Sequence, residues 1–175
     1  MEFFILLILL PVFILIAIFI VAFIFYDLKN NFKSKVFFVP SQIRVIKEFF
    51  NTYPFQKNRK FYDLGSGDGR IVFLAEKVGL KAYGIENNSA LYFLSKILKA
   101  TKKSEAIFIK GDLRKANIEE ADYIYLYLTP KFLKEIENNI FLKLKDGAKV
   151  ITYRFKFYNR QPKEIYLEKF YIYEK

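Results

Sequence analysis

The chain has 175 residues, which is enough for one domain with its own core, and it carries a net charge of +11. It contains neither cysteine nor histidine, which excludes disulfides, thiolate nucleophiles, iron–sulfur clusters, the usual zinc sites and histidine as a general base. Its chemistry must therefore use carboxylates, lysine, tyrosine, hydroxyls or a bound cofactor, and we expect no metal ion.

An uncharged apolar run opens the chain, from Phe3 to Phe25. As a helix this run would measure roughly 35 Å, which is enough to cross the hydrocarbon core of a bilayer. A cleaved signal peptide usually has a shorter apolar core, a basic start and a small-x-small cleavage site, and none of these is present. We therefore predict a retained transmembrane anchor over residues 1–26. A basic linker, residues 27–35, follows it, so the positive-inside rule places the N-terminus outside and the remaining chain in the cytoplasm.

The positive charge of the remaining residues, 36–175, has two interpretations. Nucleic acid is one partner that such a charge attracts, but the lysines are scattered and no RNA- or DNA-binding signature accompanies them. For a domain held at a bilayer, attraction to an anionic lipid surface explains the same charge. We expect a lipid surface as the partner and disfavour nucleic acid.

Residues 36–175 form one predicted domain in which strand-like and helix-like segments alternate after an initial helix. This pattern is typical of an α/β fold with a Rossmann-like, mostly parallel sheet and helices on both faces. The predicted helices are Ser41–Asn51, Gly69–Val78, Ser89–Thr101 and Lys131–Leu142. The predicted strands are Lys60–Leu64, Lys81–Glu86, Ala106–Lys110, Tyr123–Leu128 and Ala148–Phe157. Two final strands, Lys163–Leu167 and Phe170–Tyr173, are too close together for a crossover helix, so we expect an antiparallel hairpin at the sheet edge.

A glycine-rich turn lies directly between the first strand and its helix, the position at which open parallel sheets bind nucleotides. The residues expected to bind a cofactor there are Asp63, Gly65, Ser66, Gly67, Asp68 and Gly69. The dinucleotide fingerprint spaces its glycines differently, and two carboxylates in the turn would repel a diphosphate. S-adenosylmethionine carries an ammonium and a sulfonium and no phosphate, so the charge of the turn favours this cofactor.

Acidic residues also follow the next two strands. Glu86 ends the second strand, in position to accept hydrogen bonds from both ribose hydroxyls. Asp112 comes just after the third strand, where we expect a side chain that binds the adenine amino group. One turn and two acids at successive strand ends are more specific than a glycine turn alone. The alternative is a glycine turn with unrelated surface acids.

The segment from Asp63 to Val72 resembles the first motif of the seven-β-strand (class I) methyltransferases, and in particular its form in the small protein-lysine methyltransferases. That family includes archaeal broad-specificity enzymes and membrane-anchored mitochondrial enzymes that act on the ATP synthase c-subunit and the adenine nucleotide translocase. Further matching segments follow the family's order: Val39-Pro40, Glu86, Gly111–Leu113, Leu126–Pro130, Leu144–Gly147 and Val150–Phe155. The chain departs from the archaeal soluble members at Thr152-Tyr153, where they carry a Ser-His pair. The resemblance implies methylation of lysine side chains in a membrane or membrane-proximal protein.

The resemblance also implies where the methyl group is transferred. Tyr127, Thr129 and Pro130, at the end of the fourth strand, would lie beside the methyl group and orient the amine, although simple packing also accounts for Tyr127. Enzymes that methylate adenine or a glutamine amide typically carry Asp/Asn-Pro-Pro-Tyr at this strand end, so base methylation is disfavoured. Two other functions remain open: methylation of a membrane-soluble lipid or quinone, and cofactor binding without catalysis. The complete turn together with Glu86 argues against the second of these.

Overall fold

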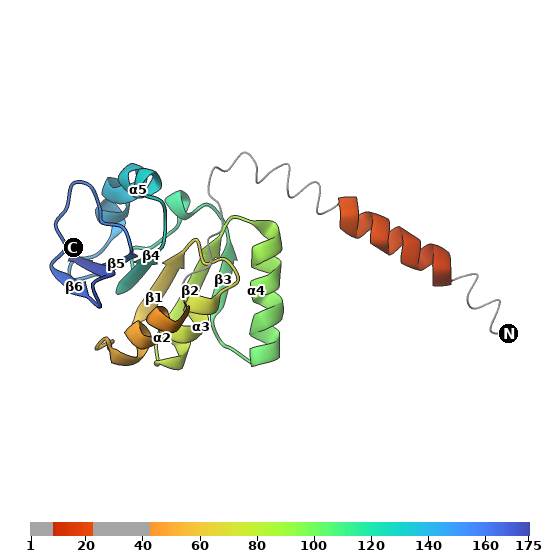
Figure 1. Ribbon diagram of the computed structural model, residues 1–175, viewed down its shortest axis with the longest axis horizontal. Coiled ribbons are helices and arrows are strands. Elements are labelled where there is room, and N and C mark those ends of the chain that lie inside the picture. Colours follow the sequence, from red (N-terminus) through yellow and green to blue (C-terminus); the bar gives the residue numbers. More distant parts are fainter. Residues whose placement is uncertain (1–8, 23–42) are drawn as a thin grey trace. The chain divides into compact units, whose positions relative to one another are not determined.

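The computed structural model describes residues 9–22 and 43–175, and the chain divides into two compact units, Met1–Lys35 and Val36–Lys175 (Figure 1). In the first unit, residues 9–22 form an α-helix whose large apolar side chains are exposed. No helix within the described residues is both long and apolar enough to cross a membrane. The predicted anchor includes residues 1–8 and 23–26, which lie outside the described part, as do the linker and Val39-Pro40.

The second unit is built on a seven-stranded sheet in the order β3-β2-β1-β4-β5-β7-β6 (Figure 1). Its strands are β1 (Lys60–Leu64), β2 (Lys81–Glu86), β3 (Ile107–Lys110), β4 (Tyr123–Leu126), β5 (Lys149–Tyr153), β6 (Glu164–Tyr166) and β7 (Phe170–Glu174). Strands β1 to β5 pair in parallel, and β7 pairs antiparallel with both β5 and β6. The predicted α/β sheet and its antiparallel hairpin at one edge are confirmed.

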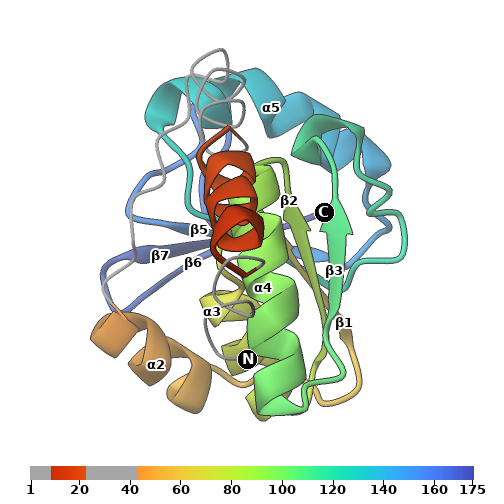
Figure 2. The same ribbon diagram turned by 90° about the vertical axis from the view of Figure 1, so that its right-hand side faces the viewer.

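Helices cover both faces of this sheet (Figure 2). They are α2 (Ile43–Thr52), α3 (Arg70–Lys77), α4 (Ser89–Lys102) and α5 (Pro130–Lys143), with the 3-10 turn η1 (Leu113–Lys115) between β3 and β4. Helices α2 and α3 pack on one face, around a core that contains Phe49 and Phe61, whereas α5 packs on the other with Leu126. Helix α4 packs on β3 and β2, at the edge of the sheet opposite the hairpin.

Aromatic rings fill the core on the side of α2. Phe49 stacks on Phe170 with ring centroids 3.9 Å apart and on Tyr53 with centroids 5.0 Å apart. Large rings bury about 150–250 Å² each and favour stacked or edge-on contacts, so they contribute strongly to the core. Since Phe170 belongs to β7, its contact with Phe49 fastens α2 to the C-terminal hairpin.

The last parallel strand is shorter than the sequence predicts. β5 ends at Tyr153, and the prediction that it runs to Phe157 is wrong. Arg154 adopts a left-handed backbone with a φ of 69°, which turns the chain out of the sheet. The Thr152 hydroxyl donates a hydrogen bond of 2.6 Å to the carbonyl of Phe155 and closes this turn.

One buried carboxylate holds the loop that follows β5. Glu137 on α5 is fully buried, and its carboxylate accepts hydrogen bonds of 3.1 Å from the backbone N–H groups of Tyr158 and Asn159. The guanidinium of Arg160 lies 3.7 Å away from the same carboxylate. Burying a charge is costly unless it is paired and hydrogen-bonded, so Glu137 and the loop backbone depend on each other.

Candidate active site

The glycine-rich turn joins β1 to α3 at the edge of the sheet where the parallel strands end. Gly65, Gly67 and Gly69 adopt φ values of 92°, 57° and 84°, a region that favours glycine. A Cβ atom on Gly69 would also lie 2.5 Å from ring carbons of Phe108. The shape of the turn therefore depends on glycine for its backbone conformation and for its close packing.

Asp63, at the end of β1, is a buried carboxylate with an unused capacity to accept hydrogen bonds. It is 3% exposed, and neither its Oδ2 atom nor the Oγ atom of Ser66 has a hydrogen-bond partner among the described residues. Burial raises the pKa of Asp63 well above its ordinary value, and the nearby carboxylates of Glu86 and Asp68 raise it further. A buried polar atom without a partner is costly unless a ligand supplies one. The site thus fits a cationic donor such as the ammonium of S-adenosylmethionine.

Glu86, at the end of β2, connects the turn to the next helix. Its Oε2 atom accepts a hydrogen bond of 2.8 Å from the N–H of Gly67, and its Oε1 atom accepts one of 2.6 Å from the N–H of Asn88. The side chain of Asn88 in turn caps α4 by accepting a hydrogen bond from the N–H of Leu91 at 3.0 Å. A carboxylate has about four acceptor positions, so Glu86 retains the capacity to accept hydroxyl donors from a ribose.

We expect Glu86→Ala to weaken S-adenosylmethionine binding by about ten- to a hundredfold, because a hydrogen bond to a charged group contributes about 1.5–3 kcal/mol. Calorimetric titration measures this change directly. Glu86→Gln is the matched control, since it keeps the shape of the side chain and one acceptor oxygen and should lose less affinity. Unchanged affinity in Glu86→Ala would remove the ribose assignment.

The other two predicted acids are each paired with the arginine two residues further along the chain. Asp68 Oδ2 lies 2.6 Å from Arg70, and Asp112 Oδ2 lies 2.6 Å from Arg114. Burial by itself would raise the pKa of Asp68, but hydrogen bonds from Arg70 outweigh it and lower the pKa. The pKa of Asp112 is lowered chiefly by its hydrogen bonds with Arg114. The negative charge of the turn is thus partly neutralised, and contacts of these two acids with the cofactor stay a prediction.

The predicted catalytic residues lie together where β4 ends. Tyr127 follows β4, Thr129 is the N-cap of α5 and Pro130 is the first residue of that helix. The Thr129 side chain makes no capping hydrogen bond, so its hydroxyl is available to a substrate. The ring of Tyr127 meets that of Tyr153 edge-on at 5.1 Å, and its hydroxyl accepts a hydrogen bond of 3.4 Å from Arg154.

Two buried tyrosines that the sequence analysis did not assign to the site lie beside these residues. The hydroxyls of Tyr125 and Tyr153 have no hydrogen-bond partner among the described residues. Burial raises the pKa of both hydroxyls, so they stay protonated and can donate. The pairing of β1 with β4 places Asp63 opposite Tyr125. The sequence did contain an indication for Tyr125. It lies two positions before Tyr127, and alternate residues of a strand share a face, so the two side chains were expected on the same side of the sheet.

Gly84, in the middle of β2, is a further residue that the sequence analysis did not assign to the site. A Cβ atom at this position would lie 2.7 Å from the Ser66 hydroxyl oxygen and 2.9 Å from a ring carbon of Phe108. Glycine inside a strand often marks a close approach of another chain segment, which was the signal for this position. Gly84 therefore lets the glycine-rich turn pack directly against β2.

We expect Gly84→Ala to displace Ser66, to weaken S-adenosylmethionine binding and to lower the stability by about 1–3 kcal/mol, the usual cost of overpacking. Adding Ser66→Gly should restore part of the affinity, because it removes the nearest clashing atom and leaves only the contact with Phe108. Titration and thermal unfolding measure the two effects. Normal binding by Gly84→Ala alone would show that β2 does not set the position of the turn.

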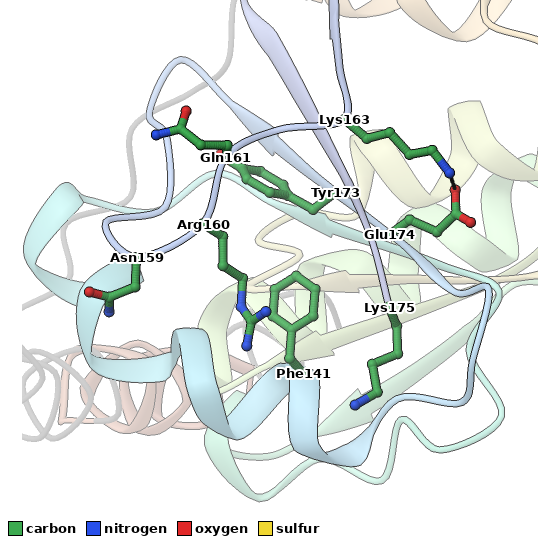
Figure 3. Close-up of a pocket in the computed structure, with 8 residues that line it drawn as sticks. All are labelled: Phe141, Asn159, Arg160, Gln161, Lys163, Tyr173, Glu174 and Lys175. Carbon is green, nitrogen blue, oxygen red and sulfur yellow. Dashed lines mark hydrogen bonds and ion pairs between the residues drawn. The ribbon is translucent and has the colours of Figure 1, made fainter.

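A hollow of about 530 Å³ lies at a different edge of this unit (Figure 3). Figure 3 shows Arg160 beside Phe141, with the guanidinium carbon 4.0 Å from the ring centroid. Glu174, which also lines the hollow, pairs with Lys149 at the start of β5. The hollow thus lies where the parallel strands begin, whereas the glycine-rich turn lies where they end. We therefore assign the cofactor site to the turn and not to this hollow.

Comparison with known proteins shows which family the chain resembles. The family described as the ANTKMT methyltransferase domain matches residues 63–164, a range that contains the turn, Glu86, Asp112 and Tyr127. The ATP synthase c-subunit lysine N-methyltransferase of Rattus norvegicus is 33% identical over 125 residues, which cover 69% of this chain and 56% of the relative. The protein-lysine N-methyltransferase of Saccharolobus islandicus (strain REY15A) is 28% identical over 132 residues, covering 73% and 82% of the two chains.

Among solved structures, the chain is similar to an RNA methyltransferase from Salinibacter ruber in complex with S-adenosyl-L-homocysteine. The TM-score is 0.68 at 31% sequence identity, and the match covers 77% of this chain and 91% of the other. The chain spans about half the length of the vertebrate relatives it matches.

Proposed function

Since the chain belongs to the ANTKMT family of class I S-adenosylmethionine-dependent methyltransferase domains, we propose that it methylates lysine side chains of a membrane or membrane-proximal protein. The observation that carries the proposal is the buried Oδ2 atom of Asp63, which has no hydrogen-bond donor among the described residues and lies beside a turn of three glycines with positive φ. Support for lysine as the acceptor comes from the rat and archaeal relatives, which are lysine N-methyltransferases.

The residues around the turn fit S-adenosylmethionine, which would supply a methyl group activated by a positively charged sulfur. Asp63 would hold the ammonium group, because its unpartnered oxygen accepts a charged donor. Glu86 would accept the ribose hydroxyls, and Asp112 would bind the adenine amino group. The glycines would let the backbone of the turn approach the ligand closely.

The residues at the end of β4 would prepare the lysine amine. A free lysine has a pKa of about 10.4, so its amine must lose a proton before it can act as a nucleophile. Binding of the amine beside Tyr127, which packs against the core that contains the buried Tyr125 and Tyr153, would disfavour the charged form of the amine and lower its pKa. The hydroxyls of Tyr127 and Thr129 would orient the neutral amine. Because the methyl group of the cofactor is already activated, its in-line transfer mainly requires that the amine and the methyl group are correctly aligned.

We place the enzyme at a membrane as a single-pass protein, with the N-terminus outside and the catalytic unit in the cytoplasm. The uncharged run within residues 1–26 supports an anchor, and Lys29, Lys33 and Lys35 support this orientation. The net charge of +11 supports attraction between the catalytic unit and an anionic lipid surface.

The test is to incubate membranes with the enzyme and radiolabelled S-adenosylmethionine and then to separate protein, lipid and RNA. Label on lysines of a protein, lost with the Asp63→Ala variant, is the expected result. Label in lipid would indicate a membrane-soluble small molecule as the acceptor. Label in RNA would indicate an activity like that of the Salinibacter ruber protein, and no label would indicate a scaffold. Each of these last three results would overturn the proposal.

A further inference from the structure

Helix α4 exposes three of its large apolar side chains, while Tyr92 packs against the core. Among the residues of α4 only Ser95 is buried, whereas Phe93, Leu94 and Ile97 are 56%, 42% and 61% exposed. Residues three and four positions apart lie next to each other on a helix, so these three side chains form one apolar face. A surface helix ordinarily turns its apolar stripe toward the core. The outward face of α4 is therefore suited to contact something outside the domain.

Lysines are the charged residues of α4. Lys96 lies three positions after Phe93 and therefore borders the apolar face. Lys99, Lys102 and the C-cap Lys103 follow toward the C-terminal end of the helix, where Lys102 lies over the ring of Phe73. No acidic residue occurs between Ser89 and Lys103. In the part of the chain that the structure describes, none of the four lysines forms an ion pair with a carboxylate. An apolar face bordered by lysine, on a helix that carries no acidic residue, is typical of a helix that lies flat in the interface of a bilayer, with its apolar side about 5–10 Å into the headgroup boundary.

The surroundings of α4 favour lipid over a second copy of this chain. In a symmetric dimer formed through α4, the lysines of one copy would face those of the other, and like charges across an interface repel. Anionic headgroups instead complement the lysines while the acyl chains accept the apolar face. The helix also packs on β3, the strand at one edge of the sheet (Figure 1).

We propose that the face of α4 formed by Phe93, Leu94 and Ile97 binds the surface of a bilayer that contains anionic phospholipid. This contact would fix the orientation of the catalytic unit, which a tether through a linker alone would not. Because the side chain of Asn88 caps α4 and its N–H donates to Glu86, the helix begins directly beside the cofactor site. The inference rests on the proposed membrane setting and is independent of the methyltransferase activity.

The absence of cysteine allows a single probe to be placed in the full chain. The Ile97→Cys variant is labelled with an environment-sensitive fluorophore and added to vesicles of phosphatidylcholine, with or without phosphatidylserine, that carry nitroxides on their acyl chains. We expect a blue shift and strong quenching in the anionic vesicles and less of both with phosphatidylcholine alone. The matched control is Leu142→Cys on α5, which is 81% exposed on the other face of the sheet and should show neither change.

Two further measurements separate the possible outcomes. Raising the salt from 0.1 M to 1 M shortens the Debye length from about 10 Å to about 3 Å and should abolish the advantage of the anionic vesicles. Adding Leu94→Glu to the labelled variant should remove most of the quenching. An unquenched probe at position 97 in anionic vesicles would overturn the inference, as would an intermolecular disulfide formed by the unlabelled variant, which indicates a second copy. Insertion of α4 without methyl transfer would refute the proposed function and leave this inference standing.

Discussion

Replacing Asp63 with asparagine should weaken S-adenosylmethionine binding by about ten- to a hundredfold while it raises the stability of the cofactor-free protein. The two effects have opposite signs because one oxygen of the buried carboxylate has no donor among the described residues, while its charge would favour a cationic ligand. Asparagine keeps the shape of the side chain and removes the charge. Calorimetric titration measures the loss of affinity, and urea denaturation without cofactor measures the gain in the free energy of unfolding.

The pH dependence of stability gives a second readout for Asp63. Its pKa is raised in the folded state, so the folded protein holds this proton more tightly than the unfolded chain does. The contribution of Asp63 to the free energy of unfolding is therefore most favourable below the ordinary aspartate pKa of about 3.9 and falls as the pH rises toward the raised value. Asp63→Asn should lack this fall. Identical pH profiles for the two proteins would show that the carboxylate is not buried as described.

Deleting residues 1–26 should lower the methylation rate of a membrane-embedded target by about 10²- to 10⁴-fold, the range by which a tether raises effective concentration. The affinity for S-adenosylmethionine should not change, because the residues proposed to bind the cofactor all belong to the second unit. Initial rates with native membranes and with a soluble lysine peptide measure the effect. The peptide is the control, since a tether gives it no advantage and both forms should methylate it equally.

Two outcomes would contradict this division of the chain. If the shortened protein methylates the membrane target as fast as the full chain, residues 1–26 do not act as a tether. If it loses its circular dichroism spectrum and fails to bind cofactor, those residues belong to the core of the domain. Residual binding of the shortened protein to anionic vesicles is the result expected from α4.

The strands next to the glycine-rich turn could be predicted from the sequence at their observed bounds. β1 and β2 are short apolar runs bounded by lysine on one side and by glycine or an acid on the other. These flanking residues indicate the first and last residue of each strand. The end of β5 could not be predicted in this way. It depends on the left-handed backbone of Arg154 and on Glu137, a residue of α5 that holds the following loop. The local pattern of apolar residues indicates neither the backbone conformation of Arg154 nor the contact of the loop with Glu137.

The acids of the site were predictable because the carboxyl ends of parallel strands meet at one edge of the sheet. That reasoning found Asp63 and Glu86 but not the pairing of Asp68 with Arg70, since a strand pattern says nothing about which side chains meet. It also left the role of Tyr153 open, because this residue comes near Tyr127 only through the pairing of β5 with β4. The missing information in both cases is tertiary.

The strand order divides the proposed site into two groups of residues, one on each side of β1. Glu86 lies on the β2 side of β1, whereas Tyr127 and Tyr153 lie on the β4 and β5 side. Substitutions at sites without shared contacts combine nearly additively, so the tyrosine half can vary without disturbing the carboxylate half. The exception is the seam, where Asp63 lies opposite Tyr125 and changes must be coupled. We therefore expect substitutions of Tyr127 and Tyr153 to affect the proposed acceptor side while they leave the affinity for the cofactor nearly unchanged.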